Sequence, residues 1–200
     1  LINLPGDGEV SEHPDGDTVY KFTQSGTFSI NIETEVSYLI VGGGSNGPSN
    51  NGGGGGQVVY VASHTLSVGT YDVIIGSGAE PTIVNISGAE IFSANSGSGS
   101  TSGNGKGPGS NASKRIGGSF SYTQLNGYGG GGGASTKGIA GSTKACSSFD
   151  RPNNEAKGGK GGTGLSYDIS GSNVTYGGGG GGRGKKSESG SGGNSCDSKV

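Results

Sequence analysis

The first ninety-odd residues alternate short apolar runs with turns that contain glycine. The runs are rich in Val, Ile, Tyr, Phe and Thr, and they occupy residues 19–23, 27–32, 36–41, 57–62, 71–75, 82–86 and 90–93. Short runs of β-branched and aromatic residues favour strands, and closely spaced turns between them are typical of antiparallel sheets. The pattern therefore predicts about seven strands in an antiparallel sandwich or roll.

Two details of this pattern make predictions about pairing and burial. The runs 19–23 and 27–32 flank Gln24-Ser25-Gly26, a turn sequence that predicts a hairpin. Because successive side chains of a strand point to opposite faces, the alternation of apolar and polar residues in these two runs predicts five inward-facing side chains: Tyr20, Phe22, Phe28, Ile30 and Ile32. The run 36–41 (VSYLIV) is almost continuously apolar, which predicts a strand buried on both faces.

Beyond residue 95 the pattern changes, because large apolar side chains become sparse and glycine dominates. Glycine makes up 49 of the 200 residues, and it forms uninterrupted runs at 129–133 and 177–182. This glycine content excludes a helical protein, since each glycine costs about 1 kcal/mol relative to alanine inside a helix. A hydrophobic fraction of 27% also excludes a large conventional core.

Two interpretations fit the glycine-rich part. A disordered low-complexity tail is one of them. The other is an ordered array of extended glycine helices with about three residues per turn, which lie side by side and exchange backbone hydrogen bonds. Apolar residues stand just before each glycine run, which favours the ordered array: Leu125 and Tyr128 before the first, Val174 and Tyr176 before the second.

The expected fold class is all-β. We expect an antiparallel β-sandwich or jelly-roll-like N-terminal half, joined to packed polyglycine (type II) helices and long glycine-rich loops. The expected division is an N-terminal arm at residues 1–18, a sandwich part at 19–94 and a glycine-rich part at 95–200. The glycine-rich part is expected to pack on the sandwich in one compact unit.

The formal net charge of −2 conceals two halves of opposite sign. Residues 1–100 contain one basic and ten acidic residues, whereas residues 101–200 contain twelve basic and five acidic residues. Such halves suit head-to-tail contact between copies, because each copy offers complementary potentials at its two ends. An equally simple alternative is that the acidic half folds against the basic half of the same chain.

The two cysteines suggest an oxidising, extracellular compartment. Cys146 and Cys196 are the only cysteines, and a disulfide between them is the simplest interpretation, within one chain or between chains. Leu1 in place of an initiator methionine fits a processed chain or a fragment, such as one that has lost a signal peptide. Three sequons permit N-glycosylation: Asn85, Asn111 and Asn173.

The sequence carries no recognisable catalytic or cofactor motif. The stretch 179–186 resembles a phosphate-binding loop, but Lys186 replaces the required Ser or Thr. Only two histidines exist, His13 and His64, and no set of ligands has metal-site spacing. No apolar run is long enough to span a membrane, and a single Arg183 between glycines is weak evidence for RNA binding. We expect no enzyme activity, no cofactor, no metal, no nucleic acid and no membrane insertion.

Four tyrosines border the glycine-rich loops, where little other bulk is available. They are Tyr122, Tyr128, Tyr167 and Tyr176. We expect them either to pack between glycine layers or to be exposed contact residues. The second alternative rests on composition, because rigid aromatics among Ser, Gly and Asn are typical of binding loops.

The order of these elements resembles a widespread glycine-rich domain. The segments that carry the resemblance are 19–32, VSYLIVGGG at 36–44, GGGGGQVVYVA at 52–62, LSVGTYDVIIGSG at 66–78 and SNVTYGGGGGGRG at 172–184. This domain occurs in phage tail-fibre and adhesin proteins, in viral and bacterial surface proteins, and more distantly in the glycine-rich region of anaplastic-lymphoma-type receptor kinases. The resemblance implies a β half fused to packed polyglycine helices, no catalysis, and a role in attachment or surface architecture.

The leading functional hypothesis is an extracellular structural subunit that assembles head-to-tail into a surface filament or fibre. The segment before residue 19 lies outside the resemblance, and Leu1, Ile2 and Leu4 are candidates for an assembly arm that adds a strand to a neighbouring copy or to its own sheet. The alternative is a viral or bacterial adhesin that binds a carbohydrate or protein receptor. A third hypothesis is an ice-binding protein, which irregularly placed threonines disfavour.

Overall fold

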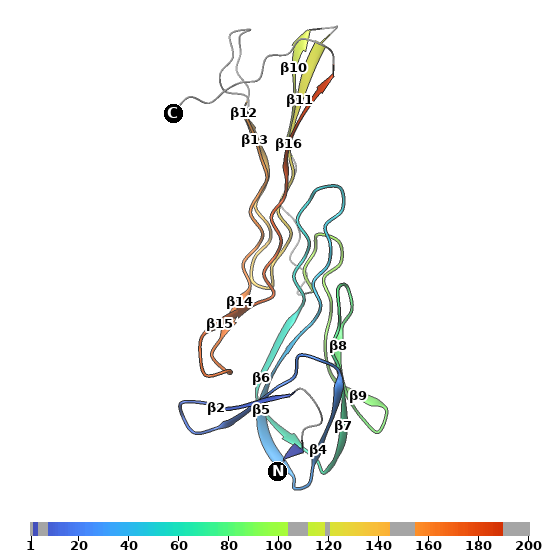
Figure 1. Ribbon diagram of the computed structural model, residues 1–200, viewed down its shortest axis with the longest axis vertical. Coiled ribbons are helices and arrows are strands. Elements are labelled where there is room, and N and C mark those ends of the chain that lie inside the picture. Colours follow the sequence, from blue (N-terminus) through green and yellow to red (C-terminus); the bar gives the residue numbers. More distant parts are fainter. Residues whose placement is uncertain (1, 4–7, 104–111, 119–120, 145–154, 190–200) are drawn as a thin grey trace.

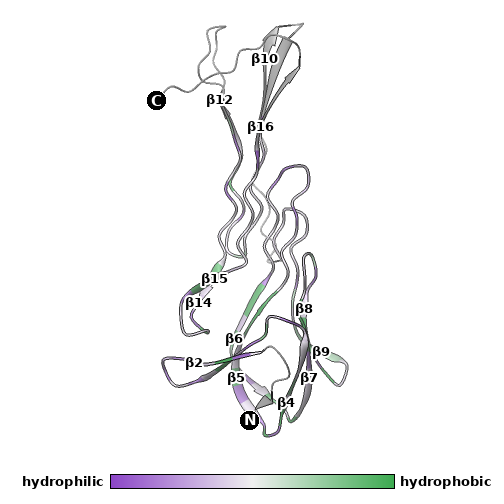
Figure 2. Ribbon diagram, in the orientation of Figure 1, coloured by the Kyte–Doolittle hydropathy of each residue, from purple (hydrophilic) through white to green (hydrophobic). Residues whose placement is uncertain are grey.

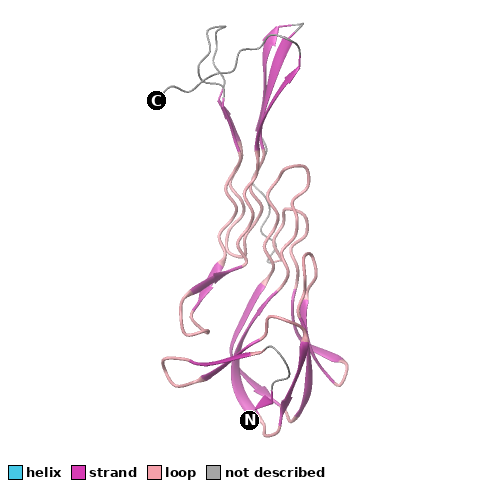
Figure 3. Ribbon diagram, viewed as in Figure 1, coloured by secondary structure: helices cyan, strands magenta, loops and turns pink. Residues whose placement is uncertain are grey.

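The computed structural model describes residues 2–3, 8–103, 112–118, 121–144 and 155–189. Within these residues the chain forms strands and loops and no helix, as Figure 3 shows. The all-β fold class expected from the sequence is therefore confirmed. The strands are β1 (Ile2–Asn3), β2 (Glu9–Glu12), β3 (Thr18–Lys21), β4 (Gly26–Ile30), β5 (Thr34–Val41), β6 (Val58–Leu66), β7 (Gly69–Ile74), β8 (Thr82–Ile86), β9 (Ala89–Ala94), β10 (Ala112–Gly118), β11 (Ser121–Gly127), β12 (Ser142–Lys144), β13 (Glu155–Lys157), β14 (Leu165–Tyr167), β15 (Val174–Tyr176) and β16 (Gly184–Ser189).

Two sheets at the N-terminal end share one hydrophobic core. The larger sheet has the order β1-β4-β7-β8-β9, with every neighbouring pair antiparallel, and the smaller sheet is the β5–β6 hairpin. Both sheets contribute buried side chains to a single cluster: Phe28, Ile30, Ile40, Leu66, Tyr71, Val73, Val84 and Ala94. The sheets together with the β2–β3 hairpin are called the proximal sheets below.

An aromatic stack lies in the middle of this core. The rings of Phe28 and Tyr71 are stacked with centroids 4.9 Å apart, and only 2% of Tyr71 is exposed. The Tyr71 hydroxyl donates a 2.8 Å hydrogen bond to the Ser67 carbonyl, so the buried phenol has a partner. Burial raises the pKa of Tyr71, since the ionised phenolate would lose solvation.

The strand pairing corrects the hairpin predicted around Gln24-Ser25-Gly26. β3 pairs with β2, whereas β4 pairs with β1 and β7, so β3 and β4 are not hairpin partners. A stronger turn explains the difference. His13 and Asp17 close the β2–β3 turn through a 2.7 Å backbone hydrogen bond, and Gly16 has a φ of 96°, in the left-handed region that favours glycine.

Two burial predictions were also wrong. Ile32 is 70% exposed, because β4 ends at Ile30 and the chain turns before the alternation reaches it. The run 36–41 is not buried on both faces, since Ile40 is its one buried side chain and Ser37 is exposed. β5 pairs with β6 alone, which leaves its other edge without a neighbouring strand in the described part of the chain.

The molecule is elongated, and extended glycine-rich segments form its middle (Figure 1). These segments are residues 42–57, 95–103, 127–141, 158–164 and 177–184, and together they are called the glycine layer below. Beyond the layer, at the end opposite the proximal sheets, lie the distal strands β10, β11, β12, β13 and β16. Figure 2 shows that the most hydrophobic described residues gather in the strands next to the layer and in the proximal sheets, while the layer itself is nearly neutral.

Backbone hydrogen bonds in the glycine layer repeat every three residues. Residues 128–134 form the central segment, and three of its amides donate to three carbonyls of residues 177–183: Tyr128 to Arg183 at 2.9 Å, Gly131 to Gly180 at 2.8 Å and Ala134 to Gly177 at 2.8 Å. Carbonyls of the same segment accept from a second neighbour at the same step: Gly129 from Gly52 and Gly132 from Gly55. A β-strand alternates between two neighbours, whereas a three-residue step directs bonds to several neighbours around one segment.

Close backbone approach explains why this layer is made of glycine. A Cβ atom added at Gly131 would lie 2.0 Å from the Gly53 carbonyl oxygen, and one added at Gly161 would lie 1.9 Å from that of Gly179. Such distances leave no space for any side chain. Glycine therefore permits the packing that satisfies the backbone groups, although it loses more conformational freedom on folding than any other residue.

Candidate assembly surfaces

Charges of opposite sign occupy the two ends of the elongated molecule. The described part of residues 8–103 contains one lysine, Lys21, and nine acidic residues. The distal strands contain six basic and two acidic residues in their sequences. Because the glycine layer separates the two groups (Figure 1), the acidic residues of the proximal sheets do not lie against the basic strands β10 and β16.

Few of the acidic side chains at the proximal end are paired within the described residues. Glu9 accepts a 2.8 Å hydrogen bond from Lys21, and this contact lowers the pKa of Glu9 and raises that of Lys21. Glu33 and Glu35 are exposed, and Glu35 accepts a hydrogen bond from the Ser63 hydroxyl. The proximal end therefore presents a net negative surface to solvent.

A polar contact joins the β2–β3 hairpin to the β14–β15 hairpin. His13 Nδ1 contacts the Asp15 carboxylate, and His13 Nε2 lies 3.2 Å from the Asp168 carbonyl oxygen. The Asp15 hydrogen bond, supported by the charge of Asp168, raises the pKa of His13. Pro14 packs beside Gly171 in the same contact, since a Cβ at Gly171 would lie 3.3 Å from its Cδ. We call this contact the hairpin latch.

The structure places the four candidate tyrosines in different surroundings. Tyr167 is half-buried and packs on Tyr60, with ring centroids 4.9 Å apart, which joins β14 to β6. Tyr128 and Tyr176 are also half-buried, at the start of the central segment and at the end of β15. Tyr122 lies in β11, paired with Gly117 and Ser189. The four are therefore spread along the molecule and do not form one cluster.

The remaining candidate residues are only partly within the described chain. Cys146, Cys196, Asn111, Leu1 and Leu4 lie outside it, so the disulfide stays a prediction. Ile2 pairs with Ile30 of the same chain, in β1 at the edge of the larger sheet. Asn85 is half-buried in β8, where the register with β9 shifts, and Asn173 is exposed just before β15.

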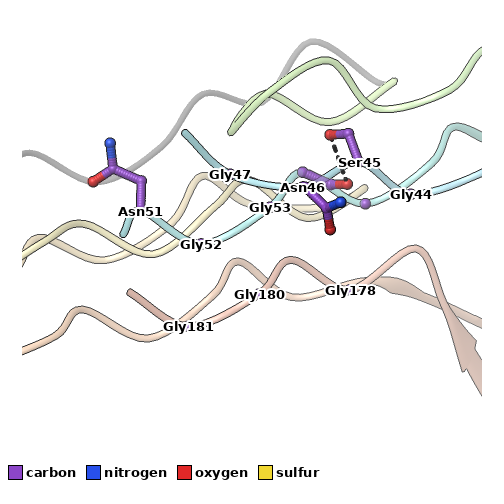
Figure 4. A pocket seen from close by; sticks show the side chains of 12 residues that line it. Gly44, Ser45, Asn46, Gly47, Asn51, Gly52, Gly53, Gly178, Gly180 and Gly181 are labelled. Atoms are coloured by element: carbon purple, nitrogen blue, oxygen red, sulfur yellow. Dashed lines mark hydrogen bonds between the residues drawn. The ribbon is translucent and has the colours of Figure 1, made fainter. Parts of the chain in front are cut away.

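A groove runs between two segments of the glycine layer (Figure 4). It has a volume of about 600 Å³, and its lining contains glycine, serine and asparagine without a charged or aromatic side chain. One wall is residues 44–47 and the other consists of Gly178, Gly180 and Gly181, with residues 51–55 between them. This groove could not be predicted from the sequence, because the glycines that line it look the same in sequence as those that are buried.

A three-residue repeat, not predicted from the sequence, marks the outer face of the layer. In KGGKGGT at 157–163, the side chains of Lys157, Lys160 and Thr163 are exposed, while Gly159 and Gly162 between them are buried. Spacing by three was the signal that could have found it. The repeat shows which residues of such a segment face solvent.

Two negative observations apply to the described residues. No cluster of three or more His, Cys, Asp or Glu side chains among them is arranged to hold a metal ion. Nor do they include a helix with the length and hydropathy needed to cross a membrane.

Strand sheets joined by a hydrogen-bonded glycine layer define the chain as a glycine-rich all-β protein. A family model described as a glycine-rich domain matches residues 23–199. The chain therefore belongs to this glycine-rich domain family. Comparisons with curated proteins and with solved structures found no match.

Proposed function

We propose that this protein is a non-enzymatic, extracellular structural subunit that assembles head-to-tail into a filament or fibre. The observation that carries the proposal is the separation of charge along the long axis. Nine acidic residues lie in the described N-terminal part, and six basic residues lie in strands at the opposite end. Opposite potentials at two ends attract copies of the chain to one another in a single orientation.

The geometry favours an open chain of subunits over a closed ring. The contact joins two different surfaces, one at each end of an elongated body, so each added subunit presents the same unoccupied end again. A head-to-tail contact of this kind produces a filament when its rotation does not close. The surfaces are strongly charged, which makes the contact sensitive to salt.

The glycine layer supplies the stiff middle of the proposed subunit. We interpret its segments as polyglycine helices packed side by side, since their hydrogen bonds repeat at the three-residue step of such helices. The central segment has hydrogen-bonded neighbours on several sides, so bending the layer would break many backbone hydrogen bonds at once. This rigidity suits a spacer that holds two charged ends apart.

Imaging of the purified chain by negative stain, with light scattering alongside, tests this proposal. We expect regular filaments at low salt, and discrete short particles at high salt. Samples with and without reductant would show whether the predicted Cys146–Cys196 disulfide contributes between copies. Monomers at high protein concentration and low salt would contradict the proposal.

A receptor-binding module is the second proposal, in line with the resemblance to adhesin and viral surface proteins. The exposed outer face of the layer supports it. Ile139 is 57% exposed between the cationic residues Lys137 and Lys160, and its amide donates to the Lys160 carbonyl at 2.8 Å. A glycan-array screen with the wild-type chain and with Ile139→Ser tests it. Binding that the substitution removes would favour the adhesin over the filament.

A further inference from the structure

The outer glycine segment, residues 177–183, presents three rows of residues at three-residue steps. The first row faces the layer, and its amides donate to residues 158–164: Gly179 to Gly162 and Gly182 to Gly159. The second row donates to the neighbouring segment 50–53: Gly180 to Gly53 and Arg183 to Asn50. The third row consists of Gly178 and Gly181, which are both exposed. Two of the three rows therefore use their hydrogen bonds inside the molecule.

The third row has no partner within the described chain. Among the described residues, neither the amide nor the carbonyl of Gly178 or Gly181 has a hydrogen-bond partner. The amides of this row follow the same three-residue spacing as those that donate hydrogen bonds in the other two rows. An amide without a partner at this spacing marks a direction in which a further extended segment could accept a hydrogen bond.

Nothing in the described chain requires glycine at these two positions. A Cβ atom at Gly178 would meet no atom within 4 Å, and one at Gly181 would come only within 3.8 Å of the Gly159 carbonyl oxygen. At Gly179, in the same run, the added atom would lie 2.3 Å from the Gly131 oxygen. Exposed glycine without a steric reason carries an entropy cost that alanine would avoid. The absence of side chains there leaves room for another backbone.

The opposite wall of the groove shows the open amides at two positions and the open space around a glycine at one of them. Gly44 and Gly47 line it, three residues apart, and within the described chain their amides donate to no partner. An added Cβ at Gly44 would come no closer than 3.5 Å to any atom, whereas one at Gly47 would lie 2.1 Å from the Asn51 carbonyl oxygen. Figure 4 shows these residues and Gly178 and Gly181 on the two sides of one groove. The groove thus has the open backbone groups, at three-residue spacing, of an unfilled position in the glycine layer.

We propose that this groove binds the glycine run 177–182 of a second copy, which pairs two copies side by side. The occupant must come within backbone distance, so it must lack side chains on the face that it presents, and this run has six consecutive glycines. The same run is one wall of the groove, so a two-fold contact makes the binding reciprocal. The groove contains no charged side chain, so this lateral contact is separate from the proposed salt-sensitive contact between ends.

Sedimentation of the full chain in about 0.5 M NaCl tests the lateral contact alone. At this salt concentration the Debye screening length falls to a few ångströms, so attraction between the charged ends is weak. We expect a dimer, and we expect the double substitution Gly178→Ala and Gly181→Ala to weaken it at least tenfold. Gly26→Ala is the matched control, since its added Cβ also meets no atom within 4 Å but lies in β4, outside the groove. The control should dimerise like the wild type.

Amide hydrogen exchange of Gly178 and Gly181 provides a second readout. The amides at positions 178 and 181 should exchange slowly in the wild-type dimer and rapidly in the doubly substituted variant, which should be monomeric. A wild-type chain that sediments as a monomer at every concentration would overturn the proposal. Protection of these amides in such a monomer would assign the groove to another segment of the same chain. Salt-sensitive filaments could still form in that case, so failure here does not decide the head-to-tail contact.

Discussion

Some positions of the glycine layer require glycine, whereas others have space for a larger residue. The atoms that an added Cβ would meet distinguish the two kinds of position. At Gly131 the added atom would meet two backbone oxygens, of Gly53 at 2.0 Å and Gly52 at 2.5 Å. At Gly178 it would meet none. Composition alone treats the two glycines as identical, whereas the structure makes opposite predictions for them.

Gly131→Ala should lower the free energy of unfolding by at least about 2 kcal/mol, since rigid backbone on both sides cannot relax around a new methyl group. Gly178→Ala should leave stability unchanged or slightly raised, because alanine restricts the unfolded chain. Thermal and urea unfolding of both variants, at concentrations where the chain is monomeric, measure the difference. Equal losses in the two variants would contradict a tightly packed central segment.

Ile30 and Ile32 make a second matched pair, because the sequence pattern predicted both side chains to be inward-facing. Ile30 is 2% exposed and Ile32 is 70% exposed. We expect Ile30→Ala to cost about 2–5 kcal/mol and Ile32→Ala less than about 0.5 kcal/mol. Urea unfolding midpoints of the two variants check this, and a large loss for Ile32→Ala would mean that the exposed isoleucine is covered in solution.

At the scale of elements, the hairpin latch makes one contact of the fold dependent on pH. The charged groups that face His13 are Asp15 and Asp168, from its own hairpin and from the β14–β15 connection. Both favour the protonated imidazole, so folding raises the pKa of His13 above its ordinary value of about 6.5. The stabilisation is complete below that ordinary value, and it is lost as pH rises through the raised pKa.

We therefore expect Asp15→Asn to lower the pKa of His13, because it removes the largest cause of the shift. Titration of the His13 ring protons by NMR, in the wild type and in the variant, measures this directly. The protection of the β2 and β3 amides, measured relative to their intrinsic exchange rates at each pH, should also fall in the wild type as the pH rises past the pKa of His13. A His13 pKa that is the same in both proteins would show that the contact with Asp15 does not form in solution.

The sequence predicted the positions of the N-terminal strands well, because alternation and turn residues are local signals. β5, β7 and β8 lie within one or two residues of the expected runs. Pairing was harder to predict, since β3 had two competing turns and Pro14-Asp15-Gly16 gave the better geometry. The groove could not be predicted from the sequence, because it depends on which glycine segments lie next to each other.

At the scale of the whole molecule, we propose that the separated charges bring copies together end to end. Counting acidic and basic residues along the sequence predicts two halves of opposite charge. The structure places these charges at opposite ends of the molecule, because the glycine layer lies between them (Figure 1). Glu33 and Glu35 lie beside the connection between β4 and β5, at the proximal end, and both are exposed. Lys185 and Lys186 lie in β16, at the distal end.

Reversing charge at one end should weaken assembly, and reversing it at both ends should restore part of it. We expect Glu33→Lys with Glu35→Lys to reduce the mean particle mass at low salt several-fold. Adding Lys185→Glu and Lys186→Glu to that variant should recover much of the loss, since attraction returns with its sign exchanged. Light scattering of the wild type and the two variants measures this. A combined variant that assembles no better than the first would mean that these ends do not meet.

Head-to-tail assembly by opposite charge is tested by the mean mass of the wild-type chain, measured by light scattering at fixed protein concentration from about 20 mM to about 500 mM NaCl. Charge-driven assembly predicts large particles at the lowest salt and a steep decrease toward monomers or lateral dimers as screening increases. A mass that stays at one or two copies across the whole salt range would contradict head-to-tail assembly by opposite charge.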